Sequence, residues 1–536
     1  MLTRRLLLLA GLAAVAAPAA HADVKPHPLF TDNMVLQRGT TCPIWGTADP
    51  GENVTVTIDS QSKSGKSTIK LGTTARDDGW WMVRVGTFQG GDKLTVTISG
   101  KNKVELKNVL AGDVWVCSGQ SNMEWRLRQL PKDEQGKKVA DKAANPNLRL
   151  FTVPNRTAAT PQKDFPVNAK ANEGKWLECT PETVIEFSAV GYFFGRDLQK
   201  ALDVPIGLIA SDWGGTPAEA WTSREGLQAE SALHHYNEKA DVAVAAMKSI
   251  DPEKAKAQYE AQIKKWKAAA AEAKKDGKKT PPQPKAPGKE AALGPHTPSS
   301  LYNGMIAPLV PFTVTGAIWY QGESNAGRAA EYRTLMPALI RDWRSKWNAE
   351  LPFFQVQLAP FQGGSSGVDY AELRDAQFHA AKTLPKVGLA VITDAGDEKD
   401  IHPQEKEPVG ARLALAVRAI AYGQKVEFSG PVYQSVRFDG NKAVVNFSHV
   451  GGGLVAKGGE LTGFAVSGQD GKFHPAKATI QGDTVVASSD KVQNPVAVRY
   501  GWVNFAKPEL NFFNKAGLPA IPFRTDDLPL TTAEKK

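Results

Sequence analysis

Four short polar turns hold the residues of this sequence that could do chemistry. They are Gly119-Gln120-Ser121-Asn122, Trp213-Gly214-Gly215-Thr216, Gln321-Gly322-Glu323-Ser324, and the stretch from Asp394 to His402. Each follows an apolar run typical of a buried strand. Together they supply a hydroxyl, glycine N–H groups, a side-chain amide, and an imidazole with carboxylates nearby. These are the parts that acyl transfer needs: a nucleophile, oxyanion donors, a base and an orienting acid.

Ser121 taken alone has a simpler interpretation, because Gly, Ser and Asn are common wherever a strand turns into a helix. A hydroxyl at such a turn also stands beside the free N–H groups of the helix start, where an anionic intermediate can be stabilised. The presence of four such turns in one chain favours catalysis over a plain turn serine.

The elements that must position these turns form a regular alternation. Helical patterns lie between the apolar runs, which are DVWVCS, VPIGLIAS, TGAIWYQ, LPFFQVQLA and VGLAVITD. Buried strands that alternate with helices predict a parallel α/β sheet. In such a sheet the ligand site lies at the carboxyl ends of the strands.

The two ends of the chain have a different pattern, with short β-rich runs separated by turn residues. This pattern predicts an N-terminal β-sandwich-like module over residues 23–107 and a C-terminal one over 426–536. The catalytic domain then covers 108–425. Residues 226–294 interrupt it with an Ala/Lys/Glu-rich and then Pro/Lys-rich segment, which predicts a solvated helical insertion followed by a linker.

The net charge of +9 is concentrated in this insertion, where residues 251–290 hold eleven Lys against six acidic residues. A basic surface for an acidic partner is one interpretation, but a solvated helix is favoured on composition. The rest of the chain is close to neutral, which argues against nucleic-acid binding as its main purpose.

The first 22 residues resemble a cleavable leader. Arg4 and Arg5 precede a short apolar stretch that ends at Ala20-His21-Ala22, as in secretory signal peptides. No later segment approaches the roughly 18 apolar residues of a membrane helix, so no membrane association is expected. The three cysteines lack zinc-ligand spacing and allow at most one disulfide. We therefore expect an exported protein, periplasmic or secreted, with no metal.

The four turns resemble the blocks of the SGNH hydrolases, which carry Ser, Gly, Asn and His in this order. The sequence is most similar to the sialate O-acetylesterase-like carbohydrate esterases, through GQSNM, WGGT, YQGES and DIHP. The resemblance extends to FSAVGYFFGR, LYNGMIAPL and GLPAIPFRTD and so covers most of the chain. It implies a flavodoxin-like three-layer SGNH hydrolase domain, a serine mechanism without cofactor, and acetylated sugars as substrates.

Carried over to this sequence, the resemblance makes Ser121 the nucleophile and His402 the general base. The oxyanion hole would comprise the backbone N–H groups of Ser121 and Gly215 and the side-chain amide of Gln321. The wider family has Asn in this third block, so Gln321 would offer the same donor on a longer arm.

The acid that orients His402 is where the sequence departs from the family pattern. The family places Asp three residues before the histidine, but position 399 is Lys. Asp400 is preferred, provided that a tight turn at Ile401 folds its carboxylate back to the ring. Asp397, or a Ser/His pair without an acid, is the alternative.

Other residues near the turns have two interpretations each. Glu323 is a second acid or, more simply, a residue that holds its turn by hydrogen bonds. Trp213, Trp221 and Trp319 lie near strand ends, where they could stack on a sugar or fill the core.

The favoured function is therefore an exported carbohydrate O-acetylesterase that forms an acyl-enzyme on serine. The alternatives are a non-catalytic carbohydrate-binding protein, or a lipase or thioesterase on the same fold. Turnover of p-nitrophenyl acetate would distinguish the esterase from a sugar-binding protein. A comparison of acetyl with octanoyl esters would distinguish it from a lipase or thioesterase. Sialic acid, xylan, xyloglucan and pectin remain open as the acetylated substrate, and no oligomeric state is predicted.

Overall fold

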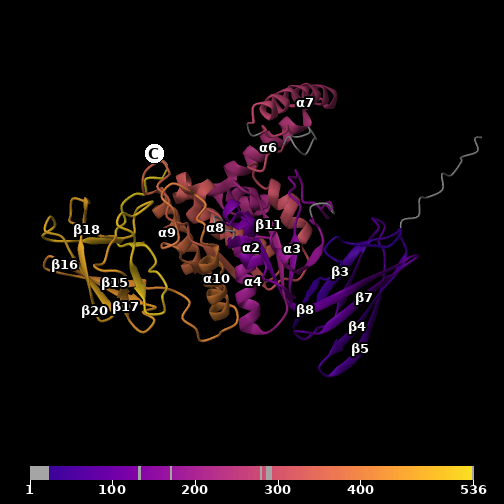
Figure 1. Ribbon diagram of the computed structural model, residues 1–536, viewed down its shortest axis with the longest axis horizontal. Coiled ribbons are helices and arrows are strands. Elements are labelled where there is room, and N and C mark those ends of the chain that lie inside the picture. The colour runs from indigo at the N-terminus through magenta and orange to yellow at the C-terminus, as the bar shows by residue number, and fades with distance from the viewer. Residues whose placement is uncertain (1–22, 131–134, 169–171, 278–279, 285–292, 534–536) are drawn as a thin grey trace, which may run out of the picture.

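The protein has an α/β centre with β-rich parts at its two ends (Figure 1). The computed structural model describes residues 23–130, 135–168, 172–277, 280–284 and 293–533. The expected leader, residues 1–22, lies outside the described residues.

The centre is built on a predominantly parallel sheet. Its strands are β8 (Lys103–Gly119), β9 (Asn145–Thr152), β10 (Trp176–Cys179), β11 (Ile206–Asp212), β12 (Gly316–Tyr320), β13 (Phe353–Val356) and β14 (Val387–Ala390). They lie in the order β10-β9-β11-β8-β12-β13-β14, and among these pairings only β10 with β9 is antiparallel. The run β11-β8-β12-β13-β14 has the 2-1-3-4-5 order of flavodoxin-like folds. The predicted parallel α/β sheet is confirmed.

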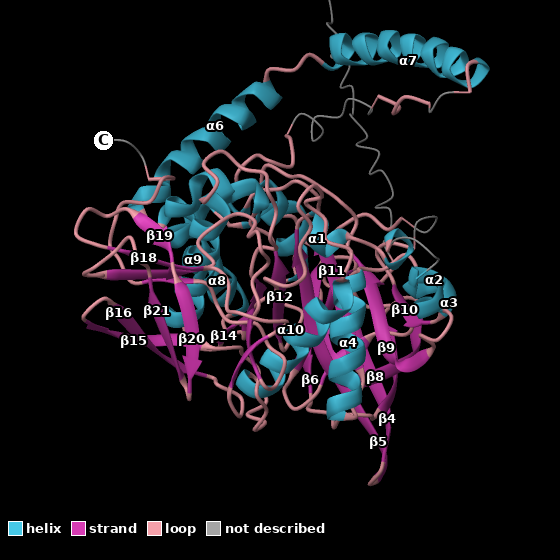
Figure 2. Cartoon of the chain, turned by 60° about the vertical axis from the view of Figure 1, so that its left-hand side comes forward, coloured by secondary structure: helices cyan, strands magenta, loops and turns pink. Residues whose placement is uncertain are grey.

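Long helices cover both faces of this sheet. They are α4 (Ala189–Leu202) and α10 (Lys406–Ile420) on one face, and α8 (Ala329–Trp347) and α9 (Asp369–Thr383) on the other. Figure 2 shows α4 in front of the central strands. Alternate residues of β12 point to opposite faces, so Trp319 meets Trp343 of α8 while Ile318 joins the core beneath α4 and α10. The result is a three-layer domain.

Shorter helices follow the strands and connect the layers. They are α1 (Ser121–Glu124), α2 (Gln135–Ala140), α3 (Pro181–Val184), α5 (Arg224–Gln228), the 3-10 turns Leu127–Gln129, Ala218–Trp221, Ser231–Leu233, Ala307–Leu309 and Glu323–Arg328, and the π-helical turn Tyr302–Ile306. Of these, α1 begins directly after β8 and so carries the first of the predicted site turns.

The N-terminal module is continuous with the central sheet through β8. Its strands are β1 (Lys25–Pro26), β2 (Val35–Gln37), β3 (Cys42–Thr47), β4 (Asn53–Ser62), β5 (Gly65–Thr74), β6 (Trp80–Val85) and β7 (Lys93–Ser99). The first half of β8 pairs antiparallel with β7, and its second half pairs with β11 and β12. The predicted boundary between residues 107 and 108 therefore falls inside one strand. The first site turn stands on a strand anchored in both parts.

The C-terminal module consists of two four-stranded sheets and one two-stranded pair. Its strands are β15 (Val432–Asp439), β16 (Lys442–Ser448), β17 (Leu454–Ala456), β18 (Phe464–Ser467), β19 (Phe473–Pro475), β20 (Lys477–Gln481), β21 (Thr484–Ser488), β22 (Ala497–Tyr500), β23 (Phe512–Asn514) and β24 (Phe523–Arg524). One shared core joins residues of the sheets, including Phe447, Phe464 and Tyr500.

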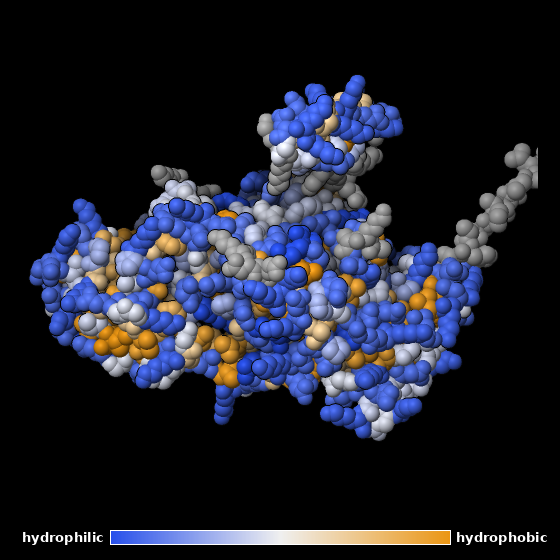
Figure 3. Space-filling model, in the orientation of Figure 1, coloured by the Kyte–Doolittle hydropathy of each residue, from blue (hydrophilic) through white to orange (hydrophobic). Residues whose placement is uncertain are grey.

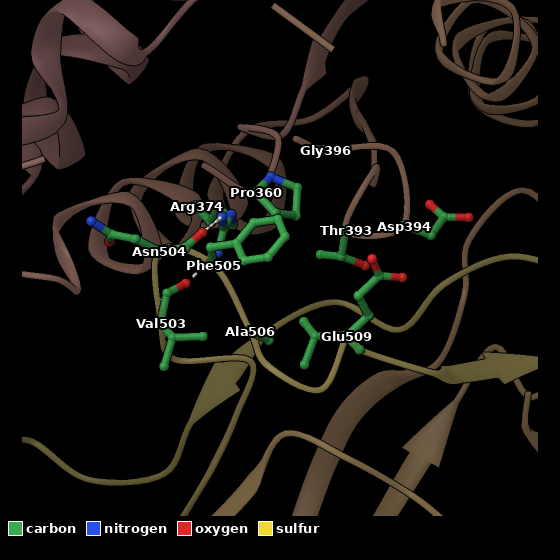
Figure 4. A pocket seen from close by; sticks show the side chains of 11 residues that line it. Pro360, Arg374, Thr393, Asp394, Gly396, Val503, Asn504, Phe505, Ala506 and Glu509 are labelled. Atoms are coloured by element: carbon green, nitrogen blue, oxygen red, sulfur yellow. Dashed lines mark hydrogen bonds between the residues drawn. The ribbon is translucent and has the colours of Figure 1, made fainter. Parts of the chain in front are cut away.

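A buried arginine fastens this module to the centre. Arg374 of α9 donates to the carbonyl oxygens of Val503 and Asn504 (Figure 4). It also donates to those of Leu358 and Ala359. Burial lowers the pKa of Arg374 to about 10. The hydrogen bonds that its guanidinium donates to these carbonyl oxygens offset part of the cost of burying the charge. The adjacent cavity, of about 40 Å³, is too small for a sugar ring, so this junction serves as a structural contact.

The predicted insertion contains two helices that project from the body, α6 (His234–Lys248) and α7 (Pro252–Lys275) (Figure 1). Asp251 caps α7 by accepting from the N–H groups of Glu253 and Lys254, and Pro252 occupies the first turn. The surface of α7 is predominantly hydrophilic (Figure 3). Among the described residues, no helix is both long and apolar enough to cross a membrane. Cys42, Cys117 and Cys179 are buried free thiols.

Candidate active site

The predicted site turns meet at one edge of the central sheet. Ser121 follows β8, Gly215 follows β11 and Gln321 follows β12, while His402 lies in the loop between β14 and α10. These strands are parallel, so their carboxyl ends share an edge. The fold thereby brings together residues that are as much as 281 positions apart in the chain.

The hydroxyl of Ser121 and the imidazole of His402 are in direct contact. Ser121 Oγ lies 2.9 Å from His402 Nε2, at hydrogen-bonding distance. A hydroxyl that donates to Nε2 requires the ring proton to be on Nδ1. The pair is therefore arranged for proton transfer from the serine to the histidine.

Asp400 approaches the other nitrogen of the ring through a tight turn. Its Oδ1 accepts the backbone N–H of His402 at 2.9 Å and stands 3.4 Å from His402 Nδ1. Asp397 accepts the N–H groups of Lys399 and Asp400 at 2.7 and 2.9 Å, which folds the preceding segment of the loop. The geometry thus favours Asp400 as the acid and gives Asp397 a part in shaping the loop.

Trp125, which the sequence did not single out, covers His402. The two rings are stacked with centroids 4.8 Å apart and an interplanar angle of 24°. Burial is the main cause that lowers the pKa of His402, and the nearby charge of Lys406 adds to it, while Asp400 opposes it. A low pKa keeps the ring in the neutral form that a general base needs. The only sequence signal for this role of Trp125 is its position four residues after Ser121.

The glycine pair of the second turn allows a close approach to Ser121. A Cβ at Gly214 would lie 2.9 Å from Glu124 Oε2 and 3.3 Å from Ser121 Cβ. Glu124 Oε2 accepts the N–H of Gly214 at 2.7 Å and so fixes the second turn to the first. Gly215 has φ +75°, and its carbonyl accepts from His296 Nε2 at 2.8 Å. This conformation favours glycine.

Gln321 occupies a different environment from the predicted one. Its side chain is fully buried, and Nε2 donates to Asn325 Oδ1 at 2.6 Å and to Thr216 O at 3.3 Å. Tyr332 donates to its Oε1 at 3.0 Å. An amide nitrogen carries two hydrogens, and both have acceptors here. The geometry therefore does not support Gln321 as an oxyanion donor; it connects the second and third turns instead.

The structure also decides between the two interpretations of Glu323 and of two of the three tryptophans near the strand ends. Glu323 accepts the side-chain amide of Asn122 at 2.6 Å, in keeping with a residue that holds its turn. Trp221 and Trp319 are fully buried, so stacking on a sugar was the wrong interpretation for both. Trp213 is half-buried. Within the described ranges, no group of three or more His, Cys, Asp or Glu side chains is placed to hold a metal ion.

Several known proteins similar to this chain are esterases. The family model for carbohydrate esterases, sialic acid-specific acetylesterases, matches residues 291–418. The crystal structure of a carbohydrate acetylesterase from Xanthomonas citri superposes with a TM-score of 0.77 at 35% sequence identity, covering 94% of this chain and 100% of the other. With the 2-1-3-4-5 sheet and its strand-end turns, these similarities define an esterase of the SGNH type.

The sequence relatives identify the family within this class. Sialate O-acetylesterase of Rattus norvegicus is 30% identical over 540 residues, which cover 92% of this chain and 93% of the relative. The protein of that name from Homo sapiens is 29% identical over 535 residues, with 92% and 91% covered. The chain belongs to the sialate O-acetylesterase family and is an acetylesterase.

Proposed function

We propose that this protein is an exported carbohydrate O-acetylesterase that removes acetyl groups from acetylated sugars or polysaccharides through an acyl-enzyme on Ser121. The observation that carries the proposal is the 2.9 Å contact between Ser121 Oγ and His402 Nε2. A serine hydroxyl is a weak nucleophile unless a neighbouring base accepts its proton.

In the first half of the reaction, Ser121 Oγ forms a bond to the carbonyl carbon of the acetyl group while His402 Nε2 takes the hydroxyl proton. The carbonyl oxygen becomes negatively charged. Two backbone N–H groups, of Ser121 at the start of α1 and of Gly215, are proposed to stabilise this charge by donating hydrogen bonds to the oxygen. The bond to the sugar oxygen then breaks, and this oxygen leaves with the proton from His402.

In the second half, His402 takes a proton from water as the water oxygen attacks the acetyl carbonyl. The second tetrahedral intermediate breaks the bond to Ser121 Oγ, which recovers its proton from His402, and acetate leaves. Asp400, 3.4 Å from Nδ1, is proposed to stabilise the imidazolium present in both halves.

The carbohydrate substrate and the export rest on separate observations. Sugar acetyl groups are suggested by the names of the similar proteins, sialate O-acetylesterase and carbohydrate acetylesterase. Export is supported by the sequence of residues 1–22, with its basic start, apolar stretch and Ala20-His21-Ala22 end.

The test compares Ser121→Ala with Ser345→Ala, which changes an exposed serine of α8. We expect the first variant to lose hydrolysis of p-nitrophenyl acetate while keeping its circular dichroism spectrum, and the second to retain full activity. Wild-type turnover in folded Ser121→Ala would refute the serine mechanism.

Substrate choice decides between the proposed function and its rivals. We expect faster cleavage of acetyl than of octanoyl esters, and release of acetate from at least one of acetylated sialic acid, xylan, xyloglucan or pectin. A preference for octanoyl esters would favour a lipase or thioesterase. Absence of any ester turnover by the wild-type protein would favour a sugar-binding protein.

A further inference from the structure

A lysine is buried against Asn122, the residue that follows the nucleophile. Lys406 is the first residue of α10, and only 1% of its surface is exposed. Its Nζ donates to Asn122 Oδ1 and lies 5.7 and 5.4 Å from the ring centroids of Trp125 and Tyr320. Burying an ammonium is costly, and the positive end of a helix dipole adds to this cost. Such an arrangement requires compensation from specific neighbours.

The neighbour that Lys406 contacts is the residue next to the nucleophile. Asn122 is fully buried, and its Nδ2 donates to Glu323 Oε1 at 2.6 Å and to the carbonyl oxygen of Ile401 at 3.1 Å. Ile401 directly precedes His402. One side chain therefore joins the nucleophile turn, the third turn and the histidine loop.

Lys406 and the two acceptors together fix which way this amide points. An ammonium group can only donate, while the Glu323 carboxylate and the Ile401 carbonyl can only accept. Oδ1 of Asn122 must therefore face Lys406, and Nδ2 must face the two acceptors. Without Lys406 the oxygen of Asn122 would lose its donor, and the reversed amide would lose both acceptors.

Burial and neighbouring charges shift the pKa values of Lys406, Glu323 and His402 in this cluster. Burial lowers the pKa of Lys406 to about 7 against the attraction of Glu323 and Asp400. Burial also raises the pKa of Glu323, whose Oε2 is enclosed without a hydrogen-bond partner among the described residues. His402 is faced by Lys406 of α10, Asp400 of its own loop, and the uncharged Ser121 and Trp125. The positive charge of Lys406 therefore disfavours protonation of His402.

We propose that Lys406 is a positioning residue of the acetylesterase: through Asn122 it holds Ser121 in register with His402, and its buried charge keeps the imidazole in the proton-accepting form. The proposal rests on the Ser121 mechanism above. It assigns a role in the reaction to a group that does not itself touch the substrate.

The test begins with Lys406→Met, which retains a long side chain but removes the charge and the donor. We expect kcat to fall by about 10²-fold, as small misplacements of reacting groups do, with KM within about twofold. The acid limb of the kcat/KM profile should move to higher pH, because loss of a nearby cation raises the pKa of His402.

Two companion variants separate charge from position. Glu323→Gln keeps an oxygen acceptor for Asn122 but removes the carboxylate that raises the pKa of Lys406. Lys406 then carries less positive charge, so the acid limb should move to higher pH. In Lys406→Met/Glu323→Gln the second change has no lysine to act on, so the acid limb should coincide with that of Lys406→Met while kcat stays low. Lys399→Met, at an exposed lysine of the same loop, is the matched control and should change neither quantity.

Thermal melting establishes which variants fold, and NMR titration of the His402 ring in a Ser121→Ala background gives a readout independent of turnover. Folded Lys406→Met with an unchanged kcat and an unchanged His402 titration would overturn the proposal and leave the Ser121 mechanism intact. If Lys406→Met does not fold, an unmoved acid limb in folded Glu323→Gln would overturn it. Activity in Ser121→Ala would instead remove the proposed function itself.

Discussion

Replacing Asp400 by Asn removes one negative charge from the vicinity of His402 and preserves the turn that carries both residues. Asp400 Oδ1 accepts the backbone N–H of His402 at 2.9 Å, and the oxygen of an Asn side chain makes the same local bond. The main change is therefore electrostatic. Asp400→Ala, in contrast, removes the charge and the turn contact together.

The size of the effect follows from distance and exposure. Asp400 Oδ1 lies 3.4 Å from His402 Nδ1, and the Asp400 side chain is 48% exposed. Coulomb's law gives about 1 kcal/mol for unit charges near this separation in bulk water and about 4 kcal/mol at an effective dielectric of about 20. Half exposure favours a value of about 2 kcal/mol, or roughly a 30-fold loss of kcat. This is well below the ~10⁴-fold loss typical of a buried triad acid.

The assay is the pH dependence of p-nitrophenyl acetate hydrolysis by Asp400→Asn, Asp400→Ala and Asp397→Asn. The Asp400 carboxylate raises the pKa of His402, so its removal should lower that pKa and move the acid limb of kcat/KM to lower pH. We expect Asp400→Ala to be less active than Asp400→Asn. A larger loss in Asp397→Asn would identify Asp397 as the acid, and wild-type kcat in both Asn variants would identify a Ser/His pair.

Two further predictions concern residues whose surroundings became clear only in the structure. Gln321→Leu should lower Tm by several degrees, because it strands buried hydrogen-bonding groups of Thr216 and Asn325 at about 1 to 3 kcal/mol each; an unchanged Tm with a loss of kcat alone would restore Gln321 as an oxyanion donor. Trp125→Leu should reduce kcat up to about tenfold, and it should move the acid limb to higher pH, because exposure of the ring raises the pKa of His402. An unmoved acid limb would show that Trp125 does not shield the ring.

The sequence predicted the features that depend on local pattern. Buried runs alternating with helical periodicity indicated the parallel sheet, and the carboxyl-end rule placed the polar turns at one edge. The requirement for a tight turn at Ile401 was also met, because Asp400 folds back to the N–H of His402.

Other features depend on contacts between distant segments and have no local pattern. Gln321 was expected to donate to substrate, but its acceptors come from Thr216 and Asn325, which only the folded chain brings within reach. The sequence analysis did not single out Lys406, because its burial depends on Trp125 and Tyr320, whose rings lie 5.7 and 5.4 Å from its Nζ in the folded chain. The predicted boundary at residues 107 and 108 lies inside β8, whose burial pattern changes from alternating to continuous while the strand continues.

The central claim is that Ser121 is the nucleophile and His402 its base, and covalent trapping tests it most directly. The wild-type protein is treated with a fluorophosphonate, which reacts with activated serine hydroxyls, and the modified peptide is located by mass spectrometry. We predict one label per chain on Ser121, no label on Ser121→Ala, and much slower labelling of His402→Ala. An active wild-type enzyme that stays unlabelled, or that carries the label on another residue, would contradict the claim.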